Sequence, residues 1–179
     1  PGELPEFLAD LAAGPQPLVY FAMGSSGNRD LVLHVLAGLG RADCQVLAPV
    51  RSHLRQEDLE TLPRNVHVTD WIPAHQLGDA VDLAITHGGE GTVQTSCVQG
   101  WPFIGIPLQF EQRFNVQRCV AFGSARLVSQ REARRTDWAE LVRQALADDG
   151  MRSRARRMAE FMEGLDGPGR AAEAICELL

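Results

Sequence analysis

Short apolar runs alternate with amphipathic stretches along the chain. Residues 18–23 are apolar and rich in β-forming side chains, and the run ends in Gly24-Ser25-Ser26-Gly27-Asn28. Four further runs have the same character, at residues 44–48, 66–71, 83–86 and 103–107. Runs of this length that lack polar alternation are typical of strands buried on both faces of a parallel sheet.

Helical periodicity predicts where the helices lie. The first helix should begin after Asn28 and end at Gly40, with an apolar face of Leu31, Val32, Val35, Leu36 and Leu39. Three later stripes predict a helical end to the chain: Leu141, Val142, Ala145 and Leu146; Ala155, Met158, Ala159, Met162 and Leu165; Ala174, Ile175, Leu178 and Leu179. Gly167-Pro168-Gly169 is expected to separate the last two helices, and residues 1–17 to be a lead-in punctuated by proline.

This order of elements predicts an α/β fold with a Rossmann-like, doubly wound parallel sheet. The chain has 179 residues, which suits one domain spanning residues 1–179. No internal repeat or long linker divides it. The first residue is Pro1 and not Met, so we expect a fragment or a processed chain.

Composition narrows the classes of function. With 45% hydrophobic and 22% charged residues the chain can bury a core, and no apolar run approaches the roughly 20 residues of a membrane helix. A net charge of -6 argues against nucleic-acid binding, which favours a basic surface. The four cysteines are far apart in sequence, so we expect buried, reduced thiols in a cytoplasmic protein without a zinc site.

Two glycine-rich loops are the candidate ligand sites, because ligands of open α/β sheets bind beyond the carboxyl ends of the strands. Gly24-Ser25-Ser26-Gly27 suits an anion, but an ordinary tight turn explains it equally well. The stronger candidate is residues 86–92, Thr-His-Gly-Gly-Glu-Gly-Thr, between a predicted strand and a predicted helix. Its glycines would let backbone amides reach a diphosphate at the positive end of the helix, while His87 and Thr92 could also bind phosphate oxygens. Neither a P-loop nor a GxGxxG pattern is present.

A family resemblance rests on several pieces in order and spacing. Trp71-Ile72-Pro73, the stretch from His87 to Thr92, Gly100-Trp101-Pro102, Pro107, Glu111-Gln112 and Asn115 together resemble the donor-site signature of UDP-glucuronosyl and UDP-glucosyl transferase relatives, including bacterial antibiotic glycosyltransferases. The resemblance is specific from about residue 65 to residue 119. It implies the C-terminal, donor-binding half of a GT-B fold, with the N-terminal acceptor domain absent from this chain.

The resemblance also implies roles for individual residues. Trp71 would stack on the nucleobase, His87 and Thr92 would hold the diphosphate, and Glu111 and Gln112 would bind sugar hydroxyls. The full set assigned to the nucleotide sugar is Gly24, Ser25, Ser26, Trp71, Ile72, His87, Gly88, Gly89, Gly91, Thr92, Glu111 and Gln112. His34, His53 and His67 lie in segments without convergent ligands and receive no role.

Two positions depart from the plant-type pattern. Ala74 stands where a glutamine would bond the base, and Thr95 stands where a glutamate would hold the ribose hydroxyls. A ribose without its 2′-hydroxyl needs that carboxylate less, so the departure tilts the prediction slightly from UDP towards dTDP.

The implied reaction is an inverting, metal-independent transfer from a UDP- or dTDP-sugar to a small acceptor, without a separate cofactor. No residue matches the catalytic base, which in the family lies in the acceptor domain, so the isolated chain should bind nucleotide and transfer little sugar. That acceptor domain could be supplied in cis, or in trans if the chain is a natural stand-alone donor subunit. A non-catalytic sugar-nucleotide-binding domain is a further alternative, as is a UDP-sugar epimerase, although the additional carboxylates of an epimerase are not identifiable.

Overall fold

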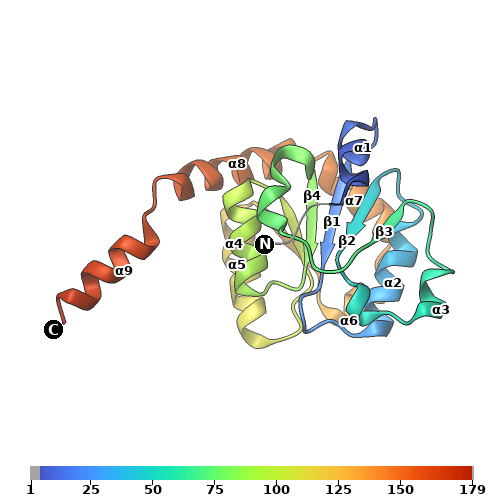
Figure 1. Ribbon diagram of the computed structural model, residues 1–179, viewed down its shortest axis with the longest axis horizontal. Helices are drawn as coiled ribbons and strands as arrows, with labels where there is room; N and C mark the ends of the chain where they lie inside the picture. The colour runs from blue at the N-terminus through green and yellow to red at the C-terminus, as the bar shows by residue number, and fades with distance from the viewer. Residues whose placement is uncertain (1–4, 179) are drawn as a thin grey trace.

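The computed structural model describes residues 5–178 (Figure 1). Within them, six parallel strands form one sheet in the order β3-β2-β1-β4-β5-β6. The strands are β1 Leu18–Ala22, β2 Gln45–Ala48, β3 Val66–Val68, β4 Leu83–Thr86, β5 Phe103–Gly105 and β6 Ala125–Leu127. This strand order is that of a doubly wound Rossmann-like sheet, and the predicted fold class is confirmed.

Helices connect the strands and cover both faces of the sheet (Figure 1). The α-helices are α1 Phe7–Ala13, α2 Arg29–Leu39, α3 Gln56–Leu59, α4 Glu90–Gln99, α5 Phe110–Phe122, α6 Gln130–Ala133, α7 Trp138–Leu146, α8 Asp149–Glu163 and α9 Gly167–Cys176. Three short 3₁₀ turns lie between them, at η1 Arg51–His53, η2 Ala74–Gln76 and η3 Gly78–Ala80. As predicted, Asn28 caps α2 by accepting a hydrogen bond from the amide of Leu31 at 3.0 Å.

Two apolar cores form because successive strand residues point to opposite faces. Val19 and Phe21 of β1 pack with α2 and with Trp138 of α7, whereas Tyr20 of β1 packs on the other face with Val116 of α5. Every residue of β1 and β4 is buried, which explains why both appear in the sequence as continuous apolar runs.

Several predicted boundaries were wrong. The run at residues 66–71 is a strand only to Val68, and the run at 103–107 only to Gly105. β6 was missed because it is a three-residue edge strand interrupted by Arg126. The predicted lead-in contains α1, whose Leu8 is buried against the second core, while residues 1–4 lie outside the described part.

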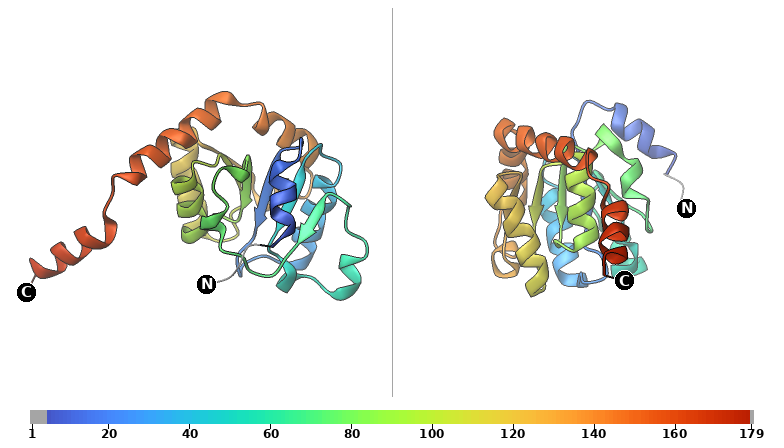
Figure 2. Two further views of the ribbon diagram at one scale, coloured as in Figure 1. Left: turned by 45° about the horizontal axis from the view of Figure 1, so that its top comes forward. Right: turned by 90° about the vertical axis from the view of Figure 1, so that its left-hand side faces the viewer.

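The last two helices differ in how they contact the rest of the molecule. α8 packs against α4, where Gly100, with a φ of +69°, brings the backbone close to Ala159. α9 then projects beyond the rest of the molecule, as Figure 1 and the left view of Figure 2 show. The expected Gly167-Pro168-Gly169 break between helices is wrong in position, because α9 already begins at Gly167 with Asp166 as its cap. Leu179 of the predicted stripe lies outside the described residues.

Candidate functional site

The loops that follow β1 and β4 lie side by side at the centre of the sheet. β1 pairs with β4, and the last residues of the two strands, Ala22 and Thr86, are in register. Strand order reverses here, since β2 and β3 lie on one side and β5 and β6 on the other. The chain therefore leaves the two strands in opposite directions and opens a crevice, which is where doubly wound sheets bind ligands.

A groove of about 460 Å³ occupies this crevice. It is lined by Tyr20, Gly24, Ser25, Trp71, Ile72, Ala74, His75, His87, Gly89, Glu90, Gly91, Thr92 and Thr95. Most of the residues assigned to the donor from the sequence are thus brought together from three loops. The structure does not bring four of the assigned residues into the lining of the groove: Ser26, Gly88, Glu111 and Gln112.

The imidazole of His87 packs closely against two glycines. A Cβ atom at Gly24 would lie 2.5 Å from Cε1 of the imidazole, and a Cβ atom at Gly89 would lie 2.4 Å from Nε2. The ring is only 7% exposed, and among the buried side-chain atoms of residues 5–178, its Nδ1 lacks a hydrogen-bond partner. Burial lowers the pKa of His87, although a bond to the backbone of Ala22 and the charge of Glu111 oppose the shift. Burial thus favours the neutral imidazole, and its Nδ1 is a buried polar atom without a partner.

The amino end of α4 faces the same groove. Gly89 caps the helix, and the amides of Glu90, Gly91 and Thr92 form its first turn, where N–H groups have no partner within the helix. A Cβ atom at Gly91 would meet nothing within 4 Å, so a ligand can approach the backbone closely. The hydroxyl of Thr92 accepts from Thr86 at 2.7 Å and donates to the carbonyl of Gly89 at 2.9 Å, which leaves its amide as the freer donor. This turn can bind an anion.

The loop after β3 supplies an aromatic wall. Trp71 is 73% exposed although it is a large apolar side chain, and Ile72 behind it is buried in the second core. Tyr20 also lines the groove, and burial raises the pKa of its phenol to about 12. A flat ligand can therefore stack on Trp71 without displacing the core.

Glu111 and Gln112 start α5 in different environments. Glu111 is exposed, whereas Gln112 is 2% exposed. The Gln112 side-chain oxygen accepts from the amides of Leu108 at 2.8 Å and Gln109 at 3.1 Å, and its amide nitrogen donates to Ser26 at 3.3 Å. Gln112 thus caps its own helix and links it to the first glycine loop. Its predicted bond to a sugar would require the side-chain amide nitrogen to bind the sugar as well as Ser26.

Two residues that received no role from the sequence hold the loops in place. Asn115 donates to the carbonyl of Gly88 at 3.2 Å, and Nε2 of His53 lies 2.7 Å from the carbonyl oxygen of Gly24. His53 is 29 positions from Gly24 in the chain. No local sequence pattern connects them, and only the adjacency of β1 and β2 could have indicated the contact.

Other predicted features are as follows. The four cysteines are free; Cys44 and Cys119 are buried and Cys97 half-buried, but Cys176 on α9 is exposed, contrary to the prediction. In the part of the chain that the structure describes, no group of three or more His, Cys, Asp or Glu residues is arranged to hold a metal ion. No helix among residues 5–178 is both long and apolar enough to cross a membrane.

Comparison with known families agrees with this geometry. Residues 33–178 match the family described as "Erythromycin biosynthesis protein CIII-like, C-terminal domain". The chain belongs to this family. The match includes the groove-forming loops after β3 and β4 and both helix starts described above.

Individual relatives are glycosyltransferases. A PGL/p-HBAD biosynthesis glycosyltransferase of Mycobacterium tuberculosis is 29% identical over 147 residues, which are 81% of this chain and 33% of the relative. The crystal structure of the glycosyltransferase SnogD from Streptomyces nogalater aligns with a TM-score of 0.76 and 25% identity over 99% of this chain and 48% of that one. VinC, a glycosyltransferase solved in complex with dTDP, shares the fold at a TM-score of 0.77 and 22% identity, over 92% of this chain and 41% of VinC. The chain therefore spans between a third and a half of these relatives' lengths.

Proposed function

We propose that this domain binds the nucleotide diphosphate of a dTDP- or UDP-sugar in the groove between the β1 and β4 loops, as the donor half of a glycosyltransferase. The observation that carries the proposal is the cradle made by the amino end of α4 and the buried imidazole of His87. The family and the glycosyltransferases related to it support the same ligand. So does VinC, which carries dTDP in its crystal structure.

The diphosphate would lie against α4. Three first-turn amides and the helix dipole favour a negative charge there, and the imidazole of His87, which lines the groove, can donate a hydrogen bond to a phosphate oxygen. The nearby phosphate would raise the pKa of this imidazole, opposing the lowering by burial. In this arrangement the charge on the departing diphosphate is stabilised by groups that already point at it.

The base and the sugar would occupy the two ends of the groove. A pyrimidine would stack on Trp71, with the backbone of Ile72 available for its polar edge because Ala74 offers no side-chain donor. The sugar would extend towards the start of α5, where the exposed Glu111 can accept two hydroxyl protons. Gln112 would contribute through the amide nitrogen that now donates to Ser26.

We further propose an inverting transfer that needs no metal or cofactor from this domain. The amides and His87 would take over the charge neutralisation that a cation provides in other transferases. The base that deprotonates the acceptor would come from an N-terminal acceptor domain, in cis or in trans. Such a partner domain would also offer a surface for Ile175 of α9 and for Leu178, which follows α9, because both are exposed here.

The binding site is tested with His87→Ala and Thr92→Ala, measuring the dissociation constant for dTDP by calorimetry. We expect His87→Ala to weaken binding about tenfold or more, because a hydrogen bond to a charged group contributes roughly 1.5–3 kcal/mol. Thr92→Ala keeps its backbone amide, so a smaller loss is expected. His34→Ala is the matched control, since His34 is an exposed helix residue that does not line the groove. Unchanged affinity in both site variants would refute the proposed site.

The preference of the groove for dTDP or UDP can be tested separately. Thr95 lines the groove, and its hydroxyl already donates to the carbonyl of Gly91 at 2.8 Å. With no carboxylate at this position to bind a 2′-hydroxyl, we expect dTDP to bind at least as tightly as UDP. A tenfold preference for UDP in the same titration would contradict this expectation.

A further inference from the structure

His53 lies where the loop after β2 meets the loop after β1. It ends the η1 turn, is half-buried, and its Nε2 is 2.7 Å from the carbonyl oxygen of Gly24. A carbonyl oxygen can only accept, so Nε2 must carry the proton and donate it. The Gly24 carbonyl therefore points at a residue of the β2 side, and His53 itself is not among the residues that line the groove.

The orientation of this carbonyl fixes the next amide. Among residues 5–178 no peptide bond is cis, and in a trans peptide the C=O and the following N–H point in opposite directions. Since the Gly24 carbonyl points at His53, the N–H of Ser25 points away from His53, and Gly24 and Ser25 both line the groove. Without an anchor this peptide could rotate, because Gly24 has a φ of +53° and a glycine tolerates either orientation.

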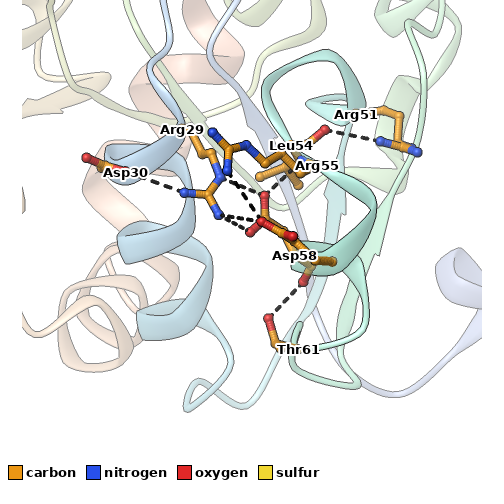
Figure 3. Close-up of polar contacts among 8 residues, drawn as sticks. Arg29, Asp30, Arg51, Leu54, Arg55, Asp58 and Thr61 are labelled. Atoms are coloured by element: carbon orange, nitrogen blue, oxygen red, sulfur yellow. Dashed lines mark hydrogen bonds and ion pairs between the residues drawn. The ribbon is translucent and has the colours of Figure 1, made fainter.

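The segment that carries His53 is itself fixed to the helix after the loop. Arg29, the first residue of α2, forms a two-pronged ion pair with Asp58 of α3, and Figure 3 shows the two side chains pointing at each other. Asp58 is 5% exposed and also accepts from the amide of Arg55 at 2.8 Å. The hydrogen bond from Arg29 holds the pKa of Asp58 below its usual range, so this ion pair persists at neutral pH. The loop from Gly24 to Asn28 is therefore anchored to the β2–α3 segment at both ends.

We propose that His53 is a positioning residue: it holds the Gly24–Ser25 peptide so that the Ser25 amide donates to a phosphate of the nucleotide diphosphate. The proposal rests on the proposed function and adds one phosphate donor to it. His53 does not touch the ligand and acts only through the Gly24 carbonyl.

The test compares His53→Ala and His53→Gln with the exposed control His34→Ala. Each variant is titrated with dTDP and with thymidine, and the ¹⁵N–¹H signal of Ser25 is followed during the dTDP titration. We expect His53→Ala to weaken dTDP binding about 10-fold or more while leaving thymidine binding unchanged, because only the diphosphate is near Ser25. The Ser25 signal should shift with dTDP in the wild type but not in His53→Ala. His53→Gln should recover most of both effects, since its amide nitrogen can donate to the same carbonyl.

The outcomes separate this inference from the proposed function. Wild-type affinity for dTDP together with a normal Ser25 response in His53→Ala would overturn the inference and leave the donor site intact. An equal loss for thymidine and dTDP would also overturn it, because that result indicates general disorder of the groove. If the wild type itself fails to bind dTDP, the proposed function fails first. If His53→Ala does not fold, the folded His53→Gln variant decides. A retained Ser25 shift with nearly wild-type dTDP affinity supports the inference, whereas loss of the Ser25 shift without any loss of dTDP affinity overturns it.

Discussion

Replacing Gly24 with alanine should damage the site from inside the fold. Gly24 has a φ of +53°, which a residue with a Cβ atom adopts at a cost of about 1–2 kcal/mol. The new methyl group would also lie 2.5 Å from Cε1 and 2.7 Å from Nε2 of His87. The backbone of Gly89 also lies close to the same ring, since a Cβ atom there would be 2.4 Å from Nε2, so the imidazole has little room to move.

The structure provides a control for the backbone part of this effect. Gly78 has a similar φ of +51°, but a Cβ atom there would meet nothing within 4 Å. Gly78→Ala should therefore cost only the backbone strain of about 1–2 kcal/mol. Gly24→Ala should cost a further ~1–3 kcal/mol for overpacking. At about 2–4 °C per kcal/mol for a domain of this size, the melting temperature of Gly24→Ala should be lower than that of Gly78→Ala by roughly 2–12 °C.

Thermal denaturation and calorimetric titration with dTDP measure both consequences. We expect Gly24→Ala to lose dTDP affinity by at least tenfold, because either the loop or His87 must move, whereas Gly78→Ala should bind normally. If the two variants melt at the same temperature and bind dTDP equally, the packing of His87 against the two glycines is not as described and the reasoning is refuted.

Three further predictions follow from other contacts. Burial lowers the pKa of His87 in the folded protein, so the unfolded chain binds more protons than the folded one below about pH 6.5. The free energy of unfolding should therefore fall as the pH drops. Between pH 7.5 and 5.5, the melting temperature should fall less for His87→Gln than for the wild type. Trp138 is 1% exposed and donates to the carbonyl of Ala133 at 3.0 Å, so Trp138→Ala should cost about 3–5 kcal/mol in urea unfolding, and a cost below ~1 kcal/mol would contradict its place in the core. Gln112→Ala removes the side-chain acceptor of two amides at the start of α5 and should lower the free energy of unfolding by about 1 kcal/mol. If the variant loses affinity for a dTDP-sugar but not for dTDP, the result would favour the predicted role of Gln112 at the sugar.

The central strands were predictable because burial on both faces leaves no polar position in the run. β4 was predicted at its observed bounds, and β1 to within one residue. The predictions failed where a segment is not buried on both faces. Arg126 interrupts the edge strand β6. After β3 the predicted run continues to Trp71, although the strand ends at Val68. There Trp71 is exposed at the groove, so its apolar character reflects a surface position and not a strand.

The candidate site was predictable as a set of loops but not as an arrangement. Gly24 and His87 each stood out because of their place after a strand, yet their contact depends on β1 pairing with β4. His53 was given no role because its partner is a backbone carbonyl, and a sequence shows only side chains. Gln112 was assigned to the sugar from a resemblance, whereas its observed bonds are to amides of its own helix start and to Ser26.

The groove depends on peptide planes that side chains from other βα units hold in place. Asn115 of α5 holds the Gly88 carbonyl, and His53 of the β2 segment holds the Gly24 carbonyl, so in each case the following N–H is turned the other way. Neither loop can keep its peptide plane in this orientation in isolation, because the anchoring residue lies next to the loop only when the sheet has formed. A nucleotide diphosphate should consequently bind the folded domain and not the unfolded chain, and at about 100 times its dissociation constant it should add about 2.7 kcal/mol to the free energy of unfolding. Binding affinity at this site is therefore a property of the whole sheet and not of the glycine-rich loops alone.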